Sequence, residues 1–232
     1  MQNKGILYSI GVGPGDPELL TLKAVKTIGR CPVVAAPRTG GGDMLALDIA
    51  RQAADLAGKT IVPLDYSMTR DETARERQHS AAAEAIEAHL AAGRDVALLN
   101  LGDVSIYATC GYLREKLKAK GYESVMIPGV PSFCAVAARL DMSLTDRDEP
   151  LHIIPGGAGG LDAALAFPGT RVLMKSGKSL PMVLEALRDR GCLEGASMVV
   201  NCGLPEELVC RDLRKAPEDA RYFATVVVKG KK

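Results

Sequence analysis

Short apolar runs alternate with helix-forming segments along this chain, and the alternation restricts the fold more than any other feature of the sequence. Before residue 140, the runs that we expect to form strands are residues 5–10, 31–36, 60–64, 95–99 and 124–127. The expected helices are residues 17–30, 43–57, 73–92 and 113–119, with Asp43 as the cap of the second. Strands that alternate with helices favour a parallel sheet with helices on both faces. We therefore predict an α/β fold.

The composition of the chain changes near residues 141–150, where acidic residues, Arg147 and Pro150 crowd a short stretch. We place a linker here, which gives an N-terminal α/β domain at residues 1–140 and a C-terminal α/β domain at residues 141–232. The second domain has expected helices at 161–167 and 180–189. Its expected strands are 151–154, 171–174, 196–201, 208–211 and 222–228. Because the last three of these follow one another closely, we predict hairpins and a mixed sheet.

Composition and charge exclude several classes of protein. The chain has 232 residues, 47% of them hydrophobic, which is enough for one large or two small cores. A formal net charge of +1 provides no field for nucleic acid, and no apolar run is long enough to span a membrane. Six cysteines without a C-x-x-C pair favour reduced thiols over a zinc site, and the three histidines lack the spacing of metal ligands. With no signal-peptide pattern at the start, we expect a cytoplasmic protein without a bound metal.

The stretch from Asn100 to Tyr107 follows the apolar run 95–99 and precedes an expected helix. Ligands of open α/β sheets bind at the carboxyl ends of strands, where the loops form a crevice. Gly102 allows a ligand to approach the backbone closely. Asp103 is able to accept hydrogen bonds from a ligand hydroxyl or amine, or to cap the following turn. Both interpretations of Asp103 stay open on these grounds alone.

A second glycine-rich loop, Gly11-Val12-Gly13-Pro14-Gly15-Asp16-Pro17-Glu18, follows the first expected strand. Asp16 suits a helix N-cap, and Pro17 suits the first helical position. The glycine spacing departs from that of dinucleotide-binding loops, and the two prolines remove backbone donors. Because a pyrophosphate site needs those N–H groups, we interpret the loop as a shaped wall for a ligand and not as a phosphate site.

Residues 11–21 resemble the N-terminal signature of the tetrapyrrole methyltransferases, which methylate uroporphyrinogen and corrin precursors with S-adenosylmethionine (SAM). Gly-Asp-Val-Ser-Ile-Tyr at 102–107 is similar to their second SAM motif, with Val104 in place of the usual proline. Residues 128–132 resemble the third motif and residues 173–175 the fourth. Four matches in order cover nearly all of the chain. The resemblance implies two α/β domains, a parallel-sheet one and a mixed-sheet one, with the active site in the cleft between them.

The resemblance also implies which residues bind SAM and its product S-adenosylhomocysteine. Asp103 is expected to accept a hydrogen bond from a ribose hydroxyl or the methionine amine, with backbone groups of Gly102, Ser105 and Ile106 as further contacts. Met174 by itself is typical of a core residue, and only the family match assigns it to the adenine. The other implied cofactor residues are Pro14, Tyr107, Ser132, Phe133, Asn201, Cys202, Leu204, Ala224, Thr225 and Val226.

The implied substrate is a reduced tetrapyrrole rich in carboxylates, which arginine recognises well. We favour Arg38, because it follows an expected strand and precedes a triple-glycine loop. Gly13 and Tyr66 complete the predicted substrate residues. A general base must remove the proton left on the methylated carbon. Asp103, Tyr66 and Tyr107 are candidates that the sequence does not distinguish, and we predict catalytic roles for Asp103 and Tyr107.

Within the family, residues 102–113 and 174–178 most resemble the subgroup that methylates the C-20 meso carbon of precorrin-2 or cobalt-factor II in cobalamin biosynthesis. Uroporphyrinogen-III methyltransferases and the precorrin C-11 and C-17 enzymes are alternatives. A non-catalytic nucleotide-binding module is an alternative of another class, because fold does not determine function. The resemblance implies a homodimer, for which the helical face of residues 81–90 offers apolar contact.

Overall fold

The computed structural model describes residues 4–39, 41–66, 71–157, 159–216 and 223–230. The chain forms two compact units, Met1–Pro131 and Ser132–Lys232. Each unit has its own five-stranded sheet with helices on both faces, which confirms the predicted α/β fold of two domains.

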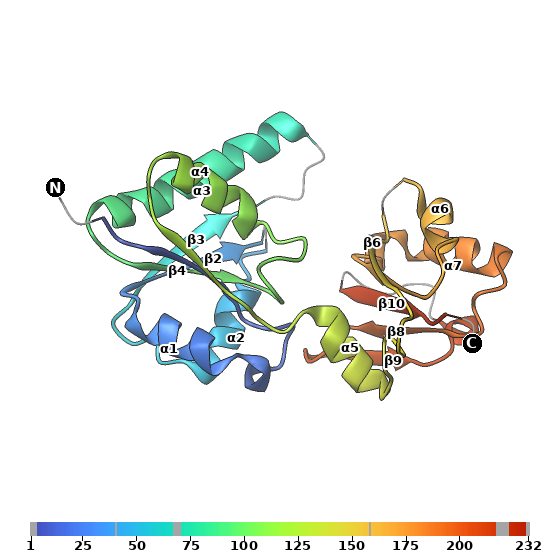
Figure 1. Ribbon diagram of the computed structural model, residues 1–232. Helices are drawn as coiled ribbons and strands as arrows, with labels where there is room; N and C mark the ends of the chain where they lie inside the picture. Colours follow the sequence, from blue (N-terminus) through green and yellow to red (C-terminus); the bar gives the residue numbers. More distant parts are fainter. Residues whose placement is uncertain (1–3, 40, 67–70, 158, 217–222, 231–232) are drawn as a thin grey trace. The chain divides into compact units, whose positions relative to one another are not determined.

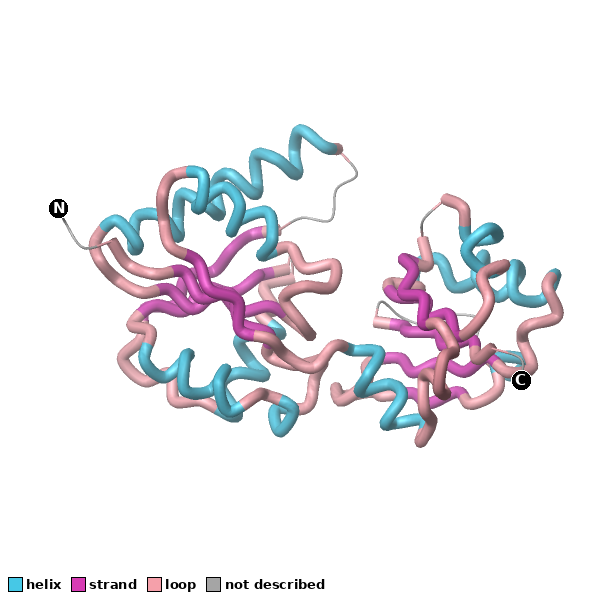
Figure 2. Tube along the Cα trace, viewed as in Figure 1, coloured by secondary structure: helices cyan, strands magenta, loops and turns pink. Residues whose placement is uncertain are grey.

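The sheet of the first unit is entirely parallel, as predicted. Its strand order is β3-β2-β4-β1-β5, so the first strand of the chain lies between the fourth and the fifth (Figures 1 and 2). All five predicted strands are present, as β1 (Leu7–Gly11), β2 (Val33–Arg38), β3 (Thr60–Asp65), β4 (Val96–Asn100) and β5 (Ser124–Ile127). The carboxyl ends of the parallel strands, and the loops that leave them, therefore lie along one edge of the sheet.

Helices cover both faces of this sheet (Figure 1). One face is covered by α3 (Glu72–Ala91) and α4 (Cys110–Ala119), and the other by α1 (Leu22–Arg30) and α2 (Leu45–Ala53). The core on the α3–α4 face joins alternate strand residues, such as Leu7 and Leu98, to the apolar stripes of the helices. Its helical residues include Ala82, Ala83, Ile86 and Leu90, which face inward. The same segment exposes Ala81, Ala85 and Ala88, so the contact with a second subunit expected at residues 81–90 stays a prediction.

Two helix starts differ from the sequence-based expectation. Residues 17–30 do not form one helix but a short 3₁₀ turn, η1 (Pro17–Leu19), followed by α1. Asp16 caps the turn by accepting from the Glu18 N–H at 2.8 Å, and the Thr21 hydroxyl caps α1 by accepting from the Ala24 N–H at 3.1 Å. The expected cap at Asp43 is wrong as well, because α2 begins after Met44 without a side-chain cap.

The second unit contains a mixed sheet of order β6-β7-β10-β8-β9, as predicted. Strands β6 and β7 are parallel, whereas β10 runs antiparallel to both β7 and β8. The expected hairpin of the last strands is present between β8 and β9, but β10 inserts between β7 and β8 and does not pair with β9. The strands are β6 (Leu151–Pro155), β7 (Thr170–Met174), β8 (Ala196–Val200), β9 (Leu208–Cys210) and β10 (Ala224–Val228).

Helices α6 (Leu161–Leu165) and α7 (Leu180–Asp189) cover one face of this sheet, and α5 (Ser132–Leu140) covers the other (Figure 1). Short 3₁₀ turns, η2 (Gly177–Ser179) and η3 (Leu213–Lys215), precede α7 and follow β9. The core between β7, β8, β10 and α7 includes Leu173, Met198, Val226 and Val183.

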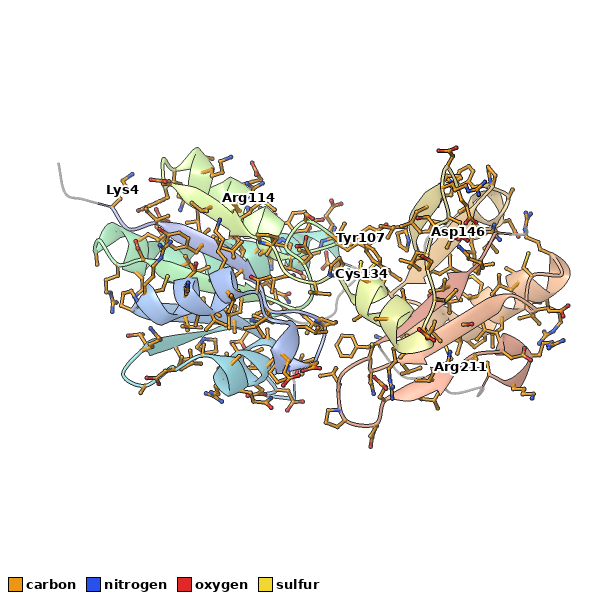
Figure 3. All side chains as sticks on the ribbon, turned by 60° about the horizontal axis from the view of Figure 1, so that its bottom comes forward. Lys4, Tyr107, Arg114, Cys134, Asp146 and Arg211 are labelled. Atoms are coloured by element: carbon orange, nitrogen blue, oxygen red, sulfur yellow. The ribbon has the colours of Figure 1, made fainter. Side chains whose placement is uncertain are left out.

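Helix α5 was not expected from the sequence, and it shifts the division between the units. The chain divides at Pro131 and Ser132, earlier than the boundary expected after residue 140, because α5 packs on β8 and β10. The Arg211 guanidinium, labelled in Figure 3, donates to the backbone oxygens of Leu140 and Arg139 at the end of α5. A cation at a helix C-terminus stabilises the exposed carbonyls there.

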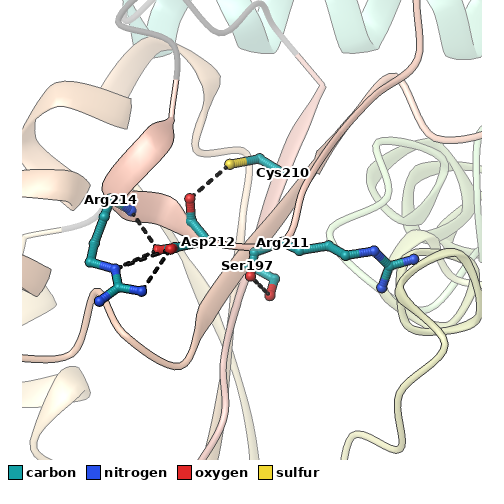
Figure 4. A network of polar contacts seen from close by, with 5 residues as sticks. All are labelled: Ser197, Cys210, Arg211, Asp212 and Arg214. Carbon is teal, nitrogen blue, oxygen red and sulfur yellow. Dashed lines mark hydrogen bonds and ion pairs between the residues drawn. The ribbon is translucent and has the colours of Figure 1, made fainter.

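A local network beside β9 holds Arg211 in place (Figure 4). The Ser197 hydroxyl donates to the Arg211 carbonyl at 3.0 Å. Arg214 donates to both carboxylate oxygens of Asp212, and its hydrogen bonds lower the pKa of Asp212 to about 2. The backbone of this turn is therefore fixed while the side chain of Arg211 extends toward α5.

Candidate functional site

Three loops meet at the carboxyl ends of β1, β4 and β5 in the first unit. Gly13 and Gly102 form an antiparallel bridge, in which the Gly102 N–H donates to the Gly13 carbonyl at 2.7 Å. The Asn100 side chain donates to the carbonyls of Leu101 and Asp103, which fixes the turn after β4. Because β4 and β1 are neighbours whose connections leave to opposite faces of the sheet, this edge is where an open α/β sheet binds ligands.

The loops are packed backbone against backbone. A Cβ atom added to Gly11 would lie 2.6 Å from the Gly102 carbonyl oxygen and 2.7 Å from the Gly129 nitrogen. A Cβ atom on Gly129 would collide with the same carbonyl oxygen and with the backbone of Gly11. Neither position accepts a side chain without a backbone shift. We call this contact of Gly11, Gly102 and Gly129 the glycine junction.

Asp103 lies beside the glycine junction with only 9% of its surface exposed. Its Oδ1 accepts hydrogen bonds from the backbone N–H of Ser105, at 2.8 Å, and from the Ser105 hydroxyl. Its Oδ2 accepts from the Gly129 N–H at 2.9 Å. Burial raises the pKa of the Asp103 carboxyl, but the hydrogen bonds from Ser105 and Gly129 outweigh it, and the pKa lies below its ordinary value. Asp103 is therefore an ionised, weakly basic carboxylate.

The other predicted residues of the first unit lie around the same junction. Pro14, Gly13 and Gly102 are buried, Ile106 is half-buried and Ser105 is exposed. Tyr107 is 43% exposed and adopts a φ of 48°, a conformation that residues other than glycine rarely adopt (Figure 3). Backbone strain of this kind persists where the surroundings enforce it, and it is frequent at ligand-binding sites.

The predicted residues of the second unit gather at one edge of its sheet. Because β10 is antiparallel to β7 and β8, the start of β10 lies beside the ends of the other two. The Ser176 N–H donates to the Ala224 carbonyl at 3.2 Å, and the Asn201 N–H donates to the Phe223 carbonyl at 3.1 Å. Met174, Asn201, Cys202 and Leu204 are half-buried here, whereas Ala224, Thr225 and Val226 are buried. Ser132 and Phe133 begin α5 in the same unit, with Phe133 buried.

Glu207 fixes the loop after β8, a role that was not predicted from the sequence. Its carboxylate accepts from the Gly203 N–H at 2.8 Å and forms an ion pair with Arg139 of α5. Asn201 at the start of this loop adopts a positive φ of 52°. Burial raises the pKa of the nearby Cys202 thiol to about 11, so Cys202 is not a reactive thiolate.

Arg38 and Tyr66 lie at the ends of β2 and β3. The Arg38 guanidinium binds the Asp65 carboxylate through Nε and Nη2, at 2.7 and 2.8 Å. The Tyr66 hydroxyl is buried and makes no hydrogen bond with the described residues. Burial raises the pKa of this phenol, so Tyr66 stays protonated and offers no phenolate to accept a proton. Its ring meets the His79 ring edge-on, at a centroid distance of 6.0 Å.

Among the described residues, no group of three or more His, Cys, Asp or Glu side chains is placed to hold a metal ion. No helix in the described parts of the chain is long and apolar enough to cross a membrane. All six cysteines are free thiols.

Several contacts at the site were not foreseen from the sequence. They include the bond from Gly129 to Asp103, the Asp65 partner of Arg38, and Glu207. The Pro-Gly-Val-Pro run at 128–131 marked a loop, but no local signal shows that its Gly129 touches the residue after β4.

Comparison with known proteins identifies relatives over nearly the whole chain. The family model of the tetrapyrrole (corrin/porphyrin) methylases matches residues 6–217. The chain is 35% identical to a precorrin-2 C(20)-methyltransferase of Sinorhizobium sp, over 97% of this chain and 96% of the relative. It is 32% identical to a cobalt-precorrin-2 C(20)-methyltransferase of Salmonella typhimurium, over 97% of this chain and 96% of that one.

A solved structure shares the fold. It is the uroporphyrin-III C-methyltransferase of Thermus thermophilus in complex with S-adenosylhomocysteine. The likeness has a TM-score of 0.70 at 24% identity and covers 97% of both chains. At this identity it supports the two-unit fold alone.

Proposed function

Because the chain belongs to the tetrapyrrole (corrin/porphyrin) methylase family, we propose that it transfers a methyl group from SAM to C-20 of precorrin-2 or of its cobalt-containing counterpart. The observation that carries this proposal is the identity of 35% and 32% to two enzymes named for that reaction, over 97% of the chain in each case.

SAM supplies an electrophilic methyl carbon on a cationic sulfur, and transfer breaks the C–S bond, forms a C–C bond and leaves a neutral thioether. The protein has three tasks: to bind the donor, to orient it, and to hold the acceptor carbon in line at about 3 Å. Rigid backbone surfaces perform these tasks without a nucleophilic side chain or a metal. The glycine junction is a surface of this kind, because the backbones of three loops are in contact there.

We assign the methyl donor to the residues that the motifs mark at the strand ends. In the first unit these are Pro14, Gly102, Ser105, Ile106 and Tyr107, which surround the glycine junction. In the second unit they are Ser132, Phe133, Met174, Asn201, Cys202, Leu204, Ala224, Thr225 and Val226. The strained backbone of Tyr107 and of Asn201 supports both sets, because strain is retained where it serves a site.

Arg38 is the proposed contact for a substrate carboxylate. Asp65 engages one side of its guanidinium and leaves further N–H groups on the outer side. An arginine oriented in this way is suited to a second, bidentate carboxylate. Gly13 and Tyr66 are proposed to line the same substrate surface. Tyr66 would contribute its ring, because its hydroxyl is buried.

Tyr107 is the accessible candidate for accepting the proton from the methylated carbon. The lowered pKa of Asp103 makes it a weak base, whereas the raised pKa and the burial of the Tyr66 hydroxyl keep that phenol protonated and away from solvent. Tyr107 is 43% exposed on the loop after β4. We therefore propose that the Tyr107 hydroxyl takes up this proton while it releases its own proton to water, so that the phenol stays neutral throughout.

The test uses methyl-labelled SAM with precorrin-2, both metal-free and cobalt-loaded, under anoxia. The expected product is one methyl heavier and carries the label at C-20. Label at C-2, C-7, C-11 or C-17 would overturn the assignment of the ring carbon. Comparing the two substrates decides whether cobalt is present when the methyl group is added. In the same assay, an unchanged kcat for Tyr107→Phe would exclude the proposed proton transfer.

A cytoplasmic location and a homodimeric state remain part of this proposal. The absence of a disulfide among the six cysteines is compatible with a reducing compartment. The product S-adenosylhomocysteine is expected to leave the same site that binds SAM.

A further inference from the structure

The Asp103 carboxylate connects two loops that are distant in the sequence. Its Oδ1 is bound by the backbone N–H and the hydroxyl of Ser105, in the loop after β4. Its Oδ2 is bound by the N–H of Gly129, in the loop after β5. The Asp103 side chain thus accepts three hydrogen bonds, two from the loop after β4 and one from the loop after β5. These two loops lie on either side of the loop after β1, whose Gly13 bridges to Gly102.

These bonds use most of what a carboxylate offers. An ionised carboxylate has about four acceptor positions, and three are already filled from within the protein. Asp103 is also 91% covered, since its exposed fraction is 9%. A donor hydroxyl or amine that approached Asp103 would have to compete with bonds to backbone N–H groups, which are costly to leave unpaired when buried.

The spacing of the loops depends on this arrangement. A Cβ on Gly11 would lie 2.7 Å from the Gly129 nitrogen, so the loop after β5 packs against the loop after β1 with no room for a side chain. Glycine contributes no side chain that would hold such a contact together. Asp103 supplies the missing attachment through the N–H of the same Gly129.

We propose that Asp103 is a positioning residue: its carboxylate holds the loop after β5 against the loop after β4, in the spacing that the methyl donor requires, and does not itself contact the donor. The inference rests on the proposed function, because it concerns the donor site of that reaction. It replaces the expected ligand contact of Asp103 by an indirect role.

The experiment compares the full-length protein with Asp103→Ala and Asp103→Asn. We expect both variants to lower the melting temperature without ligand by about 3–8 °C, because partly buried N–H groups lose their acceptor. We expect both to weaken S-adenosylhomocysteine binding about tenfold in calorimetric titration. Asparagine is not expected to restore the melting temperature or the binding, because its amide nitrogen donates and cannot accept from Ser105 or Gly129. Hydrogen exchange at the Gly129 amide should accelerate in both variants.

Asp95→Ala is the matched control. The Asp95 Oδ1 accepts from the Ile6 N–H at 2.8 Å, and this bond lies just before β4, at the end of the strand opposite to the glycine junction. Its loss also leaves a backbone N–H without its acceptor. We expect a similar drop in melting temperature for Asp95→Ala with unchanged S-adenosylhomocysteine affinity and unchanged exchange at Gly129.

Two outcomes would overturn the proposal. Weakened binding with an unchanged melting temperature and unchanged Gly129 exchange would make Asp103 a direct ligand of the donor. A lowered melting temperature with unchanged affinity would make the carboxylate purely structural. Failure of the proposed function is separate, because the unaltered protein would then not bind S-adenosylhomocysteine at all.

Discussion

Arg38 belongs to an exposed ion pair, and exposure limits what that pair contributes to folding. The Arg38 side chain is 39% exposed and that of Asp65 is 70% exposed. Ion pairs in such surroundings contribute little to stability, because solvent screens them. The strict orientation of the guanidinium is therefore more consequential for what it binds than for the free energy of unfolding.

Replacing Arg38 by alanine is expected to raise the KM for the tetrapyrrole about tenfold, which corresponds to roughly 1.4 kcal/mol. The KM for SAM and the melting temperature should change little. Arg51→Ala is the control, because Arg51 forms a comparably exposed pair with Asp48 on α2 of the same unit. Steady-state kinetics with each substrate in turn measures both effects. An unchanged tetrapyrrole KM in the Arg38 variant would remove this residue from the substrate site.

At the residue scale, the sequence indicated the right strand ends but not the partners. Asp103 and Arg38 follow strands as expected, because apolar runs mark the strands reliably. Their bonding partners Gly129 and Asp65 are 26 and 27 residues away, beyond any local pattern. The direction of the Tyr66 hydroxyl into the protein depends on the packing of α3 and α4, which the sequence alone does not specify.

Helix α3 contains a buried histidine. His79 is 5% exposed, stacks on Tyr112 at 4.9 Å between ring centroids, and meets the edge of Tyr66. Burial lowers the pKa of His79, and Arg75 and Lys116 act in the same direction while Glu76 opposes them. In the unfolded chain the pKa is near 6.5. The unfolded state therefore binds a proton first as the pH falls. The contribution of the neutral His79 to the free energy of unfolding is lost progressively from about pH 6.5 downward.

His79→Phe keeps an aromatic ring in this stack and removes the titration. We expect the melting temperature of the unaltered protein to fall more steeply between pH 7.5 and pH 5.5 than that of the variant. His89→Phe serves as a comparison, because burial and Arg94 lower the pKa of His89 on the same helix. Thermal unfolding across the pH range measures the slopes. Equal slopes for His79→Phe and the unaltered protein would contradict the expectation.

Elements were predicted well where apolar periodicity is strong and poorly where capping or long-range pairing decides. The five parallel strands of the first unit follow from their apolar runs. The break before α1 depends on the Thr21 cap, which an otherwise continuous helical pattern concealed. Helix α5 follows a loop that was interpreted only as a motif. The insertion of β10 between β7 and β8 is a pairing over long sequence distances, for which no local signal exists.

The homodimer is a prediction at the scale of the whole molecule. Cyclic dimers are the commonest soluble oligomers, and exposed aromatic side chains such as Tyr112, 61% exposed, are available for contact. Helix α3 also exposes Ala81, Ala85 and Ala88, so the face of residues 81–90 stays a candidate for the interface. Sedimentation equilibrium at micromolar concentration should give twice the 24.5 kDa mass of the chain. A mass equal to one chain would contradict the prediction.

The central place of β1 also determines when the first unit is able to fold during synthesis. Strand β1 pairs with β4 and β5, both of which follow it after long intervening segments. At about 5–20 residues added per second, β1 leaves the ribosome on the order of ten seconds before β5 does. Parallel pairing between distant strands is slow to form, because a long loop must close first. Until β5 has emerged, the apolar side chains of β1 lack one of their two neighbours, and the nascent chain depends on protection from aggregation during that interval.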